Sequence, residues 1–474
     1  MNAAHWEPPA SGDIAEYNMA YVWAISLVAA MGGLLFGYDW VVIGGAKPFF
    51  EKYFALASGA QVGWANSCAL LGCLLGSLIS GVLSDLYGRK RLLLASAVLF
   101  AVSSVLTGWA PAFFWFIVWR IVGGVAIGMA SNLSPMYIAE VAPARARGRL
   151  VAVNQLTIVV GILAAQVVNW LIAEPVPDGA TAGMIRESWN GQFGWRWMFT
   201  AVAVPSLVFL GSALFVPESP RWLVKNGRRA AAQKILVRIG GARHGEAEVR
   251  EIERTLAGEA VPQVRLQALL QPKMARVLLV GITLAVLQQW SGINVIFNYA
   301  EEVFRAAGYG VSSILFQIVI TGLVNVLFTV AAIRTVDRFG RRVLMLIGCA
   351  GIGIFHALIG VAFQFQLKGL IVVIPVLATI ACYAFSLAPV TWVLIAEIFP
   401  NRIRGAAVSV AVSALWVACF VLTYTFPLLH AALGAAKTFW LYAAICAAGF
   451  LFIRRRVPET KGKTLEQIEK DLAA

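Results

Sequence analysis

Long apolar stretches alternate with short polar segments along almost the whole chain. Each stretch holds roughly 20 residues, which is enough for a helix to cross about 30 Å of hydrocarbon. Helices satisfy every backbone group inside such a stretch, whereas a membrane barrel would show segments of about ten residues with alternating hydrophobicity. We therefore predict an all-α membrane protein. The twelve predicted spans are 20–45, 60–83, 92–109, 112–138, 150–173, 196–216, 275–303, 311–333, 342–364, 369–398, 405–429 and 436–453.

Two polar patterns occur once in each half of the chain. The segment 85–90, which reads DLYGRK, returns at 337–342 as DRFGRR. The second pattern follows the fourth span and returns after the tenth with the same spacing; its members are Glu140, Pro143, Arg147 and Gly148, then Glu397, Pro400, Arg404 and Gly405. A weaker third echo consists of Pro217-Glu218-Ser219 and Pro458-Glu459-Thr460. Such repeats are typical of transporters built from two similar halves, with the substrate site between them near the bilayer midplane.

The repeat divides the chain into two six-helix halves in parallel orientation, residues 1–217 and 275–474. The stretch between them, 218–274, is rich in charged residues and helix formers, which favours short helices. This linker is either a solvated connector or a regulatory element.

Charge is scarce and unevenly placed. Only 13% of the residues are charged, whereas a soluble domain has about 25% because its surface faces water. The net charge of +14 comes from cations that cluster after the even-numbered spans, while the alternate loops hold scattered cations such as Lys47, Arg186 and Lys368. This positive-inside bias predicts that both termini lie in the cytoplasm. The placement argues against a nucleic-acid-binding face, and we expect a multi-pass protein of the cytoplasmic membrane.

Charged groups of the repeated patterns fall at the cytoplasmic ends of the spans. Tight turns at Gly88 and Gly340 let neighbouring cations approach acidic partners and helix ends. These charges either form an inner latch between the halves, which must break as the protein opens inward, or only anchor the topology. The candidates for inner-face gating are Asp85, Arg89, Glu140, Arg147, Asp337, Arg341, Glu397 and Arg404.

Two opposite charges lie inside predicted spans, where inserting a charge costs roughly 2.5–3.5 kcal/mol. At 1.5 Å per residue, Asp39 in the first span lies about 9 Å from the outer end of its helix, and Arg120 in the fourth about 12 Å. The similar depths allow the two side chains to pair. A fixed pair would be structural, but a carboxylate whose cationic partner moves changes its proton affinity between conformations, which suits proton coupling.

The seventh span carries the amides Gln288, Gln289 and Asn294 on either side of Gly292. Amides inside an apolar helix are costly without partners. On one unbroken helix Asn294 would not share a face with Gln288, so we expect a break near Gly292 that brings them together. Amides exchange hydrogen bonds with hydroxyls and aromatic rings pack on C–H faces, which suits a small neutral polyhydroxyl ligand. Other amide and aromatic residues within the spans are Gln155, Asn325 and Trp392. Any one of them alone would be explained by a hydrogen bond between helices.

Residues of catalytic type form no recognisable group. The sequence has no nucleophile with an adjacent base, no Walker loop and no metal-ligand spacing, and its six cysteines all fall in apolar spans. His356 stands alone in the ninth span, where we expect a structural role. We therefore expect neither an enzyme nor a bound cofactor or metal.

Taken together, the motifs resemble those of a known family. Over nearly its whole length the chain is similar to the sugar porter family of the major facilitator superfamily, in particular to bacterial D-xylose–proton symporters and more distantly to facilitative glucose transporters. The motifs that carry the resemblance are Gly37-Tyr38-Asp39, Asp85-x-x-Gly88-Arg89-Lys90, Pro135-x-Tyr137-x-x-Glu140, Pro217-Glu218-Ser219-Pro220-Arg221, Gln288-Gln289-x-Ser291-Gly292-Ile293-Asn294 and Pro458-Glu459-Thr460-Lys461-Gly462.

The resemblance implies a proton-coupled monosaccharide symporter that works by alternating access, as a monomer in the lipid bilayer and without a cofactor. Its partners would be a proton and a small neutral sugar, a pentose or hexose such as D-xylose or D-glucose. Asp39, with Arg120 nearby, would serve proton coupling, since passive carriers of the family usually have a neutral residue in place of Asp39. The residues implied to line the sugar site are Gln155, Gln288, Gln289, Asn294, Asn325, Trp392 and Trp416.

Four features depart from the family pattern. Leu415 replaces an amide, Ala388 replaces the glycine of a Gly-Pro pair, and Asn298 replaces a tyrosine. The second carboxylate of xylose symporters would fall at Ala201 or Val202 and is absent. A passive uniporter therefore remains open. So does a sugar sensor with a transporter-like fold, although a long cytoplasmic tail would favour that reading and this tail is short.

Overall fold

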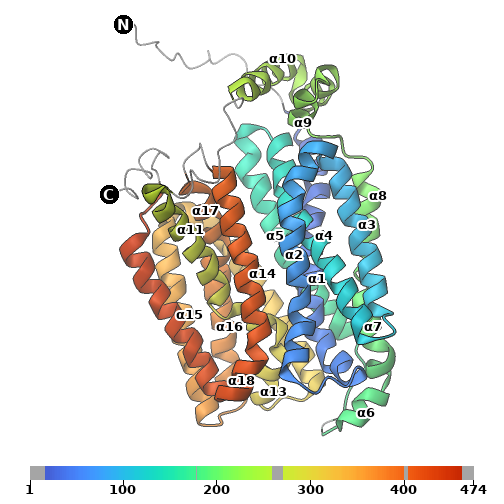
Figure 1. The fold of residues 1–474 in the computed structure, drawn as a ribbon, viewed down its shortest axis with the longest axis vertical. Helices are drawn as coiled ribbons and strands as arrows, with labels where there is room; N and C mark the ends of the chain where they lie inside the picture. The colour runs from blue at the N-terminus through green and yellow to red at the C-terminus, as the bar shows by residue number, and fades with distance from the viewer. Residues whose placement is uncertain (1–16, 178, 259–270, 400–403, 462–474) are drawn as a thin grey trace.

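The protein is a bundle of long helices, most of which run along the long axis of the molecule (Figure 1). The computed structural model describes residues 17–177, 179–258, 271–399 and 404–461. The elements of the first half are α1 (Met19–Tyr53), α2 (Gly59–Tyr87), α3 (Arg89–Gly108), α4 (Phe113–Val141), α5 (Ala144–Ile172), α6 (Ala182–Glu187), the π-helical turn η1 (Asn190–Gly194), α7 (Trp195–Thr200) and α8 (Ala203–Ala213).

The linker contributes α9 (Pro220–Lys225) and α10 (Arg229–Gly258), and the latter is two helices that meet at a kink at Gly240 and Gly241. These helices lie at one end of the bundle, here called the linker end, and α6 and α13 lie at the opposite end (Figure 1). The elements of the second half are α11 (Pro272–Trp290), α12 (Ile293–Asn298), α13 (Ala300–Ala306), α14 (Val311–Phe339), α15 (Arg341–Gln364), α16 (Leu370–Phe385), α17 (Leu387–Glu397) and α18 (Arg404–Arg456).

Within the described residues, eleven helical stretches are long and apolar enough to cross a membrane. The last of them, Ala406–Arg456, turns at Gly434, whose φ of 78° is not helical, so it supplies two of the predicted spans. Span six is Asn190–Ala213, and span ten, Leu370–Ile395, combines α16 and α17. The prediction of an all-α membrane protein is confirmed. The domain boundaries at 217 and 274 stay a prediction.

The first span is longer than we predicted. Its end was expected at residue 45, but α1 continues to Tyr53 and includes Lys47 and Pro48. The interpretation of Lys47 as a scattered loop cation was wrong, because its side chain is buried inside the bundle. A helix can hold a cation there only if carboxylates neutralise it, and three of them do so, as described below.

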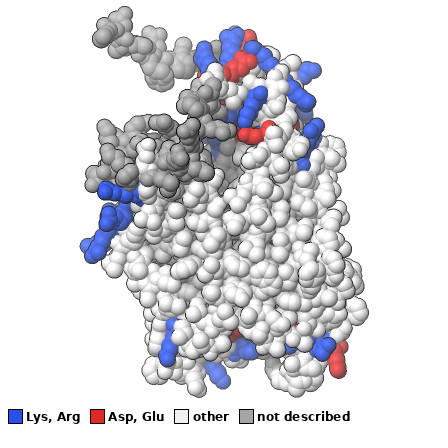
Figure 2. All heavy atoms as spheres, in the orientation of Figure 1, with Lys and Arg blue, Asp and Glu red and all other residues white. Residues whose placement is uncertain are grey.

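Charged side chains avoid the middle of the visible surface. Figure 2 shows them gathered mainly toward the linker end, with a few at the opposite end and a broad uncharged band between. Large apolar side chains such as Leu171 and Phe215 are 68% and 89% exposed. Water would disfavour so much exposed apolar surface, whereas lipid solvates it.

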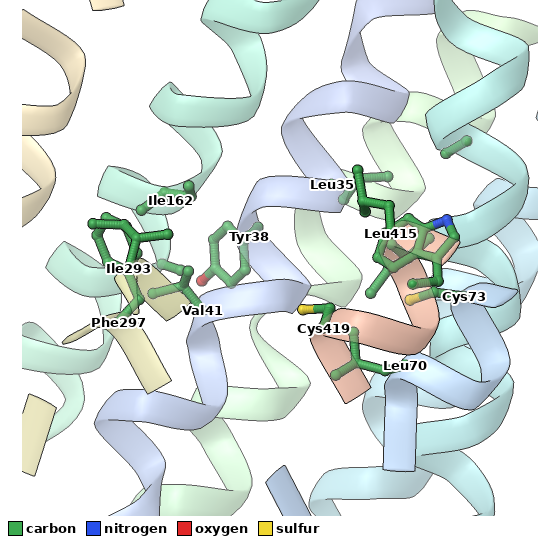
Figure 3. Close-up of a cluster of buried hydrophobic side chains, with 14 of the residues drawn as sticks. Leu35, Tyr38, Val41, Leu70, Cys73, Ile162, Ile293, Phe297, Leu415 and Cys419 are labelled. Atoms are coloured by element: carbon green, nitrogen blue, oxygen red, sulfur yellow. The ribbon is translucent and has the colours of Figure 1, made fainter. Parts of the chain in front are cut away.

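The two halves meet along a seam of apolar side chains. Its members come from α1, α2 and α5 of the first half and from α12 and α18 of the second (Figure 3). The side chains labelled there are Leu35, Tyr38, Val41, Leu70, Cys73, Ile162, Ile293, Phe297, Leu415 and Cys419, all of them buried. Polar groups beside this seam need partners in the protein or in a bound substrate.

Candidate functional site

The seventh span is broken in its middle. α11 ends at Trp290 and α12 begins at Ile293, because Gly292 takes a left-handed conformation with φ 85° and ψ 0°. A residue with a side chain would be strained in this conformation, which explains the glycine. The break predicted near Gly292 is confirmed.

The break joins three predicted amides into one chain of hydrogen bonds. Asn294 Nδ2 donates to Gln289 Oε1 at 2.5 Å, and Gln289 Nε2 donates to Gln288 Oε1 at 3.2 Å. Gln288 Nε2 lies 3.3 Å from the carbonyl oxygens of both Leu387 and Ala388, at the start of α17. All three side chains are buried, so these bonds fix their orientation. Asn294 Oδ1 accepts no hydrogen bond from a described residue, so this acceptor is free at the end of the chain of hydrogen bonds.

Two further predicted amides lie on helices of different halves. Gln155 on α5 is half-buried and Asn325 on α14 is buried. Neither forms a hydrogen bond with another residue in the described part of the chain. Their amide groups therefore retain donors and acceptors for a ligand.

The two predicted tryptophans differ in their surroundings. Trp416 on α18 is buried, and its ring centroid lies 6.1 Å from that of Phe36 and 6.4 Å from that of Trp40, both on α1. Its Nε1–H has no hydrogen-bond partner within the described ranges. Trp392 on α17 is 37% exposed, one turn beyond the carbonyls that hold Gln288. Packing of either ring on a sugar stays a prediction.

The departures from the family pattern change the wall of this region. Leu415, one residue before Trp416, lies in the apolar seam (Figure 3), so an aliphatic surface stands where an amide would exchange hydrogen bonds. Asn298 is 2% exposed, and its Oδ1 lacks a partner among the described residues. The polar groups available to a ligand therefore differ from those of the family pattern.

Asp39 and Arg120 form the predicted ion pair. Arg120 Nη1 lies 3.1 Å from Asp39 Oδ1, and both side chains are buried. Asp39 Oδ2 and Arg120 Nε have no hydrogen-bond partner in the described structure. A proton on Asp39 Oδ2 would therefore displace no existing bond, while it would remove the charge that holds Arg120. The coupling role of the pair stays a prediction.

Comparisons with known proteins identify the family. A family model described as "Sugar (and other) transporter" matches residues 25–472. The chain belongs to this sugar transporter family. It is 38% identical over 485 residues to the D-xylose-proton symporter of Escherichia coli strain K12, covering 96% of each chain. It is 39% identical over 455 residues to the arabinose-proton symporter of Bacillus subtilis strain 168, again covering 96% of each.

A solved structure confirms the fold of this sugar transporter. The xylose transporter XylE from E. coli, in a partially occluded inward open conformation, matches with a TM-score of 0.82 and 37% identity, over 94% of this chain and 100% of that one. The protein is thus a major facilitator transporter of the sugar–proton symporter group and not an enzyme.

At the linker end of the transporter, the repeated charged motifs form one cluster in each half. Arg89 holds the Glu140 carboxylate with Nε and Nη2, both at 3.0 Å, and its Nη1 lies 3.1 Å from Asp85. In the second half Arg341 Nη2 lies 3.5 Å from Glu397. Each of these pairs lies within one half, and the inner latch stays a prediction.

The other three members of the predicted gating set are Arg147, Asp337 and Arg404. Arg147 is exposed and makes no ion pair with a described residue. The side chains of Asp337 and Arg404 lie outside the described part of the structure. Their roles stay predictions.

Sequence reasoning missed the role of Glu218. Its Oε1 accepts hydrogen bonds from the backbone N–H groups of Arg89 at 2.8 Å and Lys90 at 3.1 Å, at the start of α3. The first N–H groups of a helix lack intrahelical partners, and a carboxylate there also meets the positive end of the helix dipole. Gly88 allows this approach, since it has φ 95° and a Cβ would lie 2.2 Å from Glu218 Oε2.

Glu459 repeats this arrangement in the second half. It accepts from the backbone N–H of Arg341 at 2.8 Å and of Arg342 at 3.1 Å, at the start of α15. Gly340 has φ 89°, and a Cβ would lie 2.7 Å from Glu459 Oε2. The weak third echo in the sequence was the available signal for both carboxylates.

At the opposite end, five charged residues form what we call the cross-half cluster: Lys47, Glu51, Glu301, Glu302 and Arg305. The buried Lys47 Nζ lies 3.0 Å from Glu51 Oε1 and 3.4 Å from Glu301 Oε2, and it also pairs with Glu302. Arg305 pairs with Glu301 from the exposed side. Because Lys47 is on α1 and the two glutamates on α13, these ion pairs join the halves. The spacing of Lys47 and Glu51, one helical turn apart, was the sequence signal that we missed.

Proposed function

We propose that this protein is a proton-coupled monosaccharide symporter of the cytoplasmic membrane that works by alternating access. The sugar would be a neutral pentose or hexose, such as D-xylose or D-glucose. The observation that carries the coupling is the buried Asp39–Arg120 pair, because it holds a carboxylate with one free oxygen inside a membrane span.

The amide chain supports a neutral sugar as the cargo. All seven residues of the proposed site are uncharged at neutral pH, so a charged ligand would find no counter-ion among them. Asn294 Oδ1 would accept from a hydroxyl, Gln155 and Asn325 would both give and accept, and Trp416 would pack a ring face or donate its N–H. The bonds that already join Gln288, Gln289 and Asn294 reduce the entropy that binding must remove.

The Asp39–Arg120 pair supports proton coupling by a simple exchange. A close Arg120 stabilises the charged carboxylate, so the proton leaves more readily than when Arg120 is distant. When the halves move and Arg120 withdraws, burial disfavours the charge and a proton binds. The proton would thus be carried only in the conformations where the pair is loose.

The distribution of charge supports an orientation with the linker end in the cytoplasm. Cations cluster after the even-numbered spans, which end on that side, and this follows the positive-inside rule. Both termini would then be cytoplasmic and the cross-half cluster would close the outer side. The likeness to an inward open xylose transporter agrees with this conformation. One chain holds both halves and the site, so a monomer would suffice.

Uptake into proteoliposomes tests the coupling. A membrane potential of 100 mV supplies about 2.3 kcal/mol per charge, enough for about 40-fold accumulation of a neutral sugar. Wild type should accumulate labelled xylose or glucose under an imposed gradient. Asp39→Asn, which mimics the protonated form, should lose accumulation and keep exchange of labelled for unlabelled sugar. Glu246→Gln, on the exposed face of α10, should behave as wild type.

The outcomes separate the alternatives. If Asp39→Asn still accumulates sugar, the pair is structural and coupling lies elsewhere. If wild type equilibrates sugar but never accumulates it, the protein is a passive uniporter. Binding without any flux would indicate a sensor.

The site assignment has its own test. Asn294→Ala or Gln288→Ala should weaken sugar binding by a factor of about 2 to 10, the value of one neutral hydrogen bond. Trp392→Ala should weaken binding more than Trp392→Phe if the ring packs on the sugar. Unchanged affinity in both amide variants would remove span seven from the site.

A further inference from the structure

The break in span seven leaves the backbone carbonyl of Ser291 without its helical donor. In a continuous helix the oxygen of Ser291 would accept from the N–H of Val295. Here the N–H of Val295 donates to Gly292 instead, at 3.2 Å. A buried carbonyl without a partner would cost roughly 1–3 kcal/mol. The Ser291 carbonyl therefore needs a donor from elsewhere.

His356 supplies that donor from span nine. Its Nε2 lies 2.8 Å from the Ser291 oxygen, and because a carbonyl only accepts, the imidazole must carry its proton on this nitrogen. The side chain is 0% exposed, and its ring lies 5.5 Å from Phe439 and 5.9 Å from Tyr442, centroid to centroid. The sulfur of Cys446 approaches the same oxygen only at 3.9 Å. His356 is thus the principal partner of the freed carbonyl.

The same side chain also limits the shape of the break. A Cβ on Gly292 would lie 2.9 Å from His356 Nε2 and 2.9 Å from Tyr442 Cγ. Gly292 is therefore enclosed by Tyr442 and by His356, which also bonds the neighbouring Ser291. Because the His356 ring packs against Gly292 and donates to the Ser291 carbonyl, it holds this turn in one conformation.

The break in turn decides where Asn294 lies. Residues 289 and 294 of a continuous helix would be about 140° apart around the axis, at 100° per residue. In the structure Asn294 Nδ2 and Gln289 Oε1 are 2.5 Å apart. His356 is hydrogen-bonded to none of the three amides in the described structure, so its effect on them passes through the backbone.

We propose that His356 is a positioning residue for the substrate: it clamps the turn at Ser291–Gly292 and so sets the affinity of the amide chain for sugar. This inference rests on the proposed function of the amides as sugar ligands. It assigns a specific task to a histidine for which the sequence suggested only a structural role.

Three substitutions separate the clamp from simple packing. His356→Phe keeps a ring but has no donor, and His356→Asn has a donor on a side chain too short to reach. His356→Gln places an amide nitrogen near the position of Nε2. On purified full-length protein, calorimetric titration with D-xylose and D-glucose should show affinity about tenfold weaker for the first two, as expected for one buried hydrogen bond, and within about threefold of wild type for His356→Gln.

A matched control and a double variant give the decisive comparison. Thr379→Val also removes a bond from a buried side chain to a backbone carbonyl, that of Thr379 Oγ1 to Pro375 at 2.9 Å within span ten, and should leave affinity unchanged. In an Asn294→Ala background, His356→Phe should weaken binding by less than about twofold, because the side chain that it positions is gone. The proposal would be overturned if the double variant loses affinity by the product of the two single losses. Wild-type affinity in both His356→Phe and His356→Asn would overturn it as well.

Hydrogen exchange without sugar tests the clamp apart from the proposed function. Backbone amides of 293–298 should exchange faster in His356→Phe and His356→Asn than in wild type or Thr379→Val, because the turn opens more often. Unchanged exchange would refute the clamp. If wild type binds neither sugar but the exchange differs as expected, the sugar assignment fails and the clamp stands.

Discussion

The two ends of the transporter use charge in opposite ways. At the linker end, Arg89 pairs with Asp85 and Glu140 inside the first half, and Arg341 pairs with Glu397 inside the second. At the other end the cross-half cluster ties α1 to α13 through Lys47. The described ion pairs thus hold each half together at one end and hold the two halves to each other at the opposite end.

This difference follows the internal repeat. The linker-end motifs occur twice in the sequence and build the same arrangement twice, down to the glutamate at the start of α3 and of α15. The cross-half cluster occurs once, and so do the amides of span seven and the Asp39–Arg120 pair. Repeated residues therefore form the scaffold of each half, whereas the cross-half cluster, which occurs once, joins the two halves.

The largest effect should come from Lys47→Met, which keeps the apolar stem and removes the charge. Three carboxylates would then face each other across the halves, and loss of one partner from a buried ion pair costs about 3–5 kcal/mol. We expect the opposite end to open, with a population shift of about 100-fold or more. Spin labels at the exposed positions Ala57 and Gln366 would report the opening as a longer distance.

The control for this experiment is Lys225→Met, which breaks the half-exposed pair with Asp85 at the linker end. Exposed pairs contribute little, so the label distance should not change. A distance unchanged in Lys47→Met as well would show that the apolar seam alone keeps the halves closed.

A smaller effect of a different kind is expected for Arg89→Met. Its bonds to Glu140 and Asp85 stay within one half, so the loss should lower the free energy of unfolding by about 1.5–3 kcal/mol without opening either end. Thermal unfolding in detergent measures the first quantity and the same spin labels measure the second. A changed label distance would contradict the assignment of Arg89 to a single half.

Gly88→Ala and Gly340→Ala test whether the two scaffolds are equivalent. Each glycine has a positive φ and faces a glutamate oxygen that a Cβ would meet at 2.2 Å and 2.7 Å, respectively. Each substitution should cost about 1–3 kcal/mol of stability, with the larger loss at Gly88. Unfolding temperatures of the two variants decide the point, and a loss in only one of them would argue against equivalence.

The smallest effect is a pH dependence of closure at the cross-half cluster. The seventh span was predicted to end at residue 303, but it ends at Asn298, so Glu302 on α13 lies beyond it. Burial raises the pKa of Glu302 to about 7; Lys47 opposes this rise, whereas Glu301 and Glu51 add to it. In the open state, with water around it, the pKa should return toward about 4.3.

The closed state therefore binds more protons than the open state between these two pKa values, and closure should become more favourable as the pH falls from 7 toward 5. The gain is at most about 1.4 kcal/mol per pH unit. Glu302→Gln should remove the slope of label distance against pH. A slope that persists in this variant would point to another charged group in or beside the cluster, such as Glu51, Lys52, Arg305 or His430.

Much of the fold was predictable because its causes are local. Spans follow from runs of apolar residues, and the break at Gly292 follows from a glycine among amides that must meet. The Asp39–Arg120 contact could be predicted because a charge inside a span needs a counter-ion. The estimated depth of Asp39 was too small, since α1 ends at Tyr53 and not at residue 45.

The remainder depends on contacts between distant parts of the chain. Lys47 meets Glu301 across 254 positions, and nothing near Lys47 indicates that partner. The break between α16 and α17 at Ser386 and the bond from His356 to the turn are likewise products of packing between spans. In such cases an isolated polar residue in an apolar stretch shows that a partner exists without showing which one.

The linker is bonded to the first half at several points. Trp222 Nε1 donates to the carbonyl of Asp85, the backbone N–H of Asn18 donates to Ile239, and the guanidinium of Arg238 lies 4.2 Å from the centroid of the Tyr21 ring. Through these contacts α9 and α10 should move together with spans one and two. A fluorophore carried by α10 would consequently follow the tilt of the first half, and its energy transfer to a dye near Arg455 would record each turnover in a single molecule.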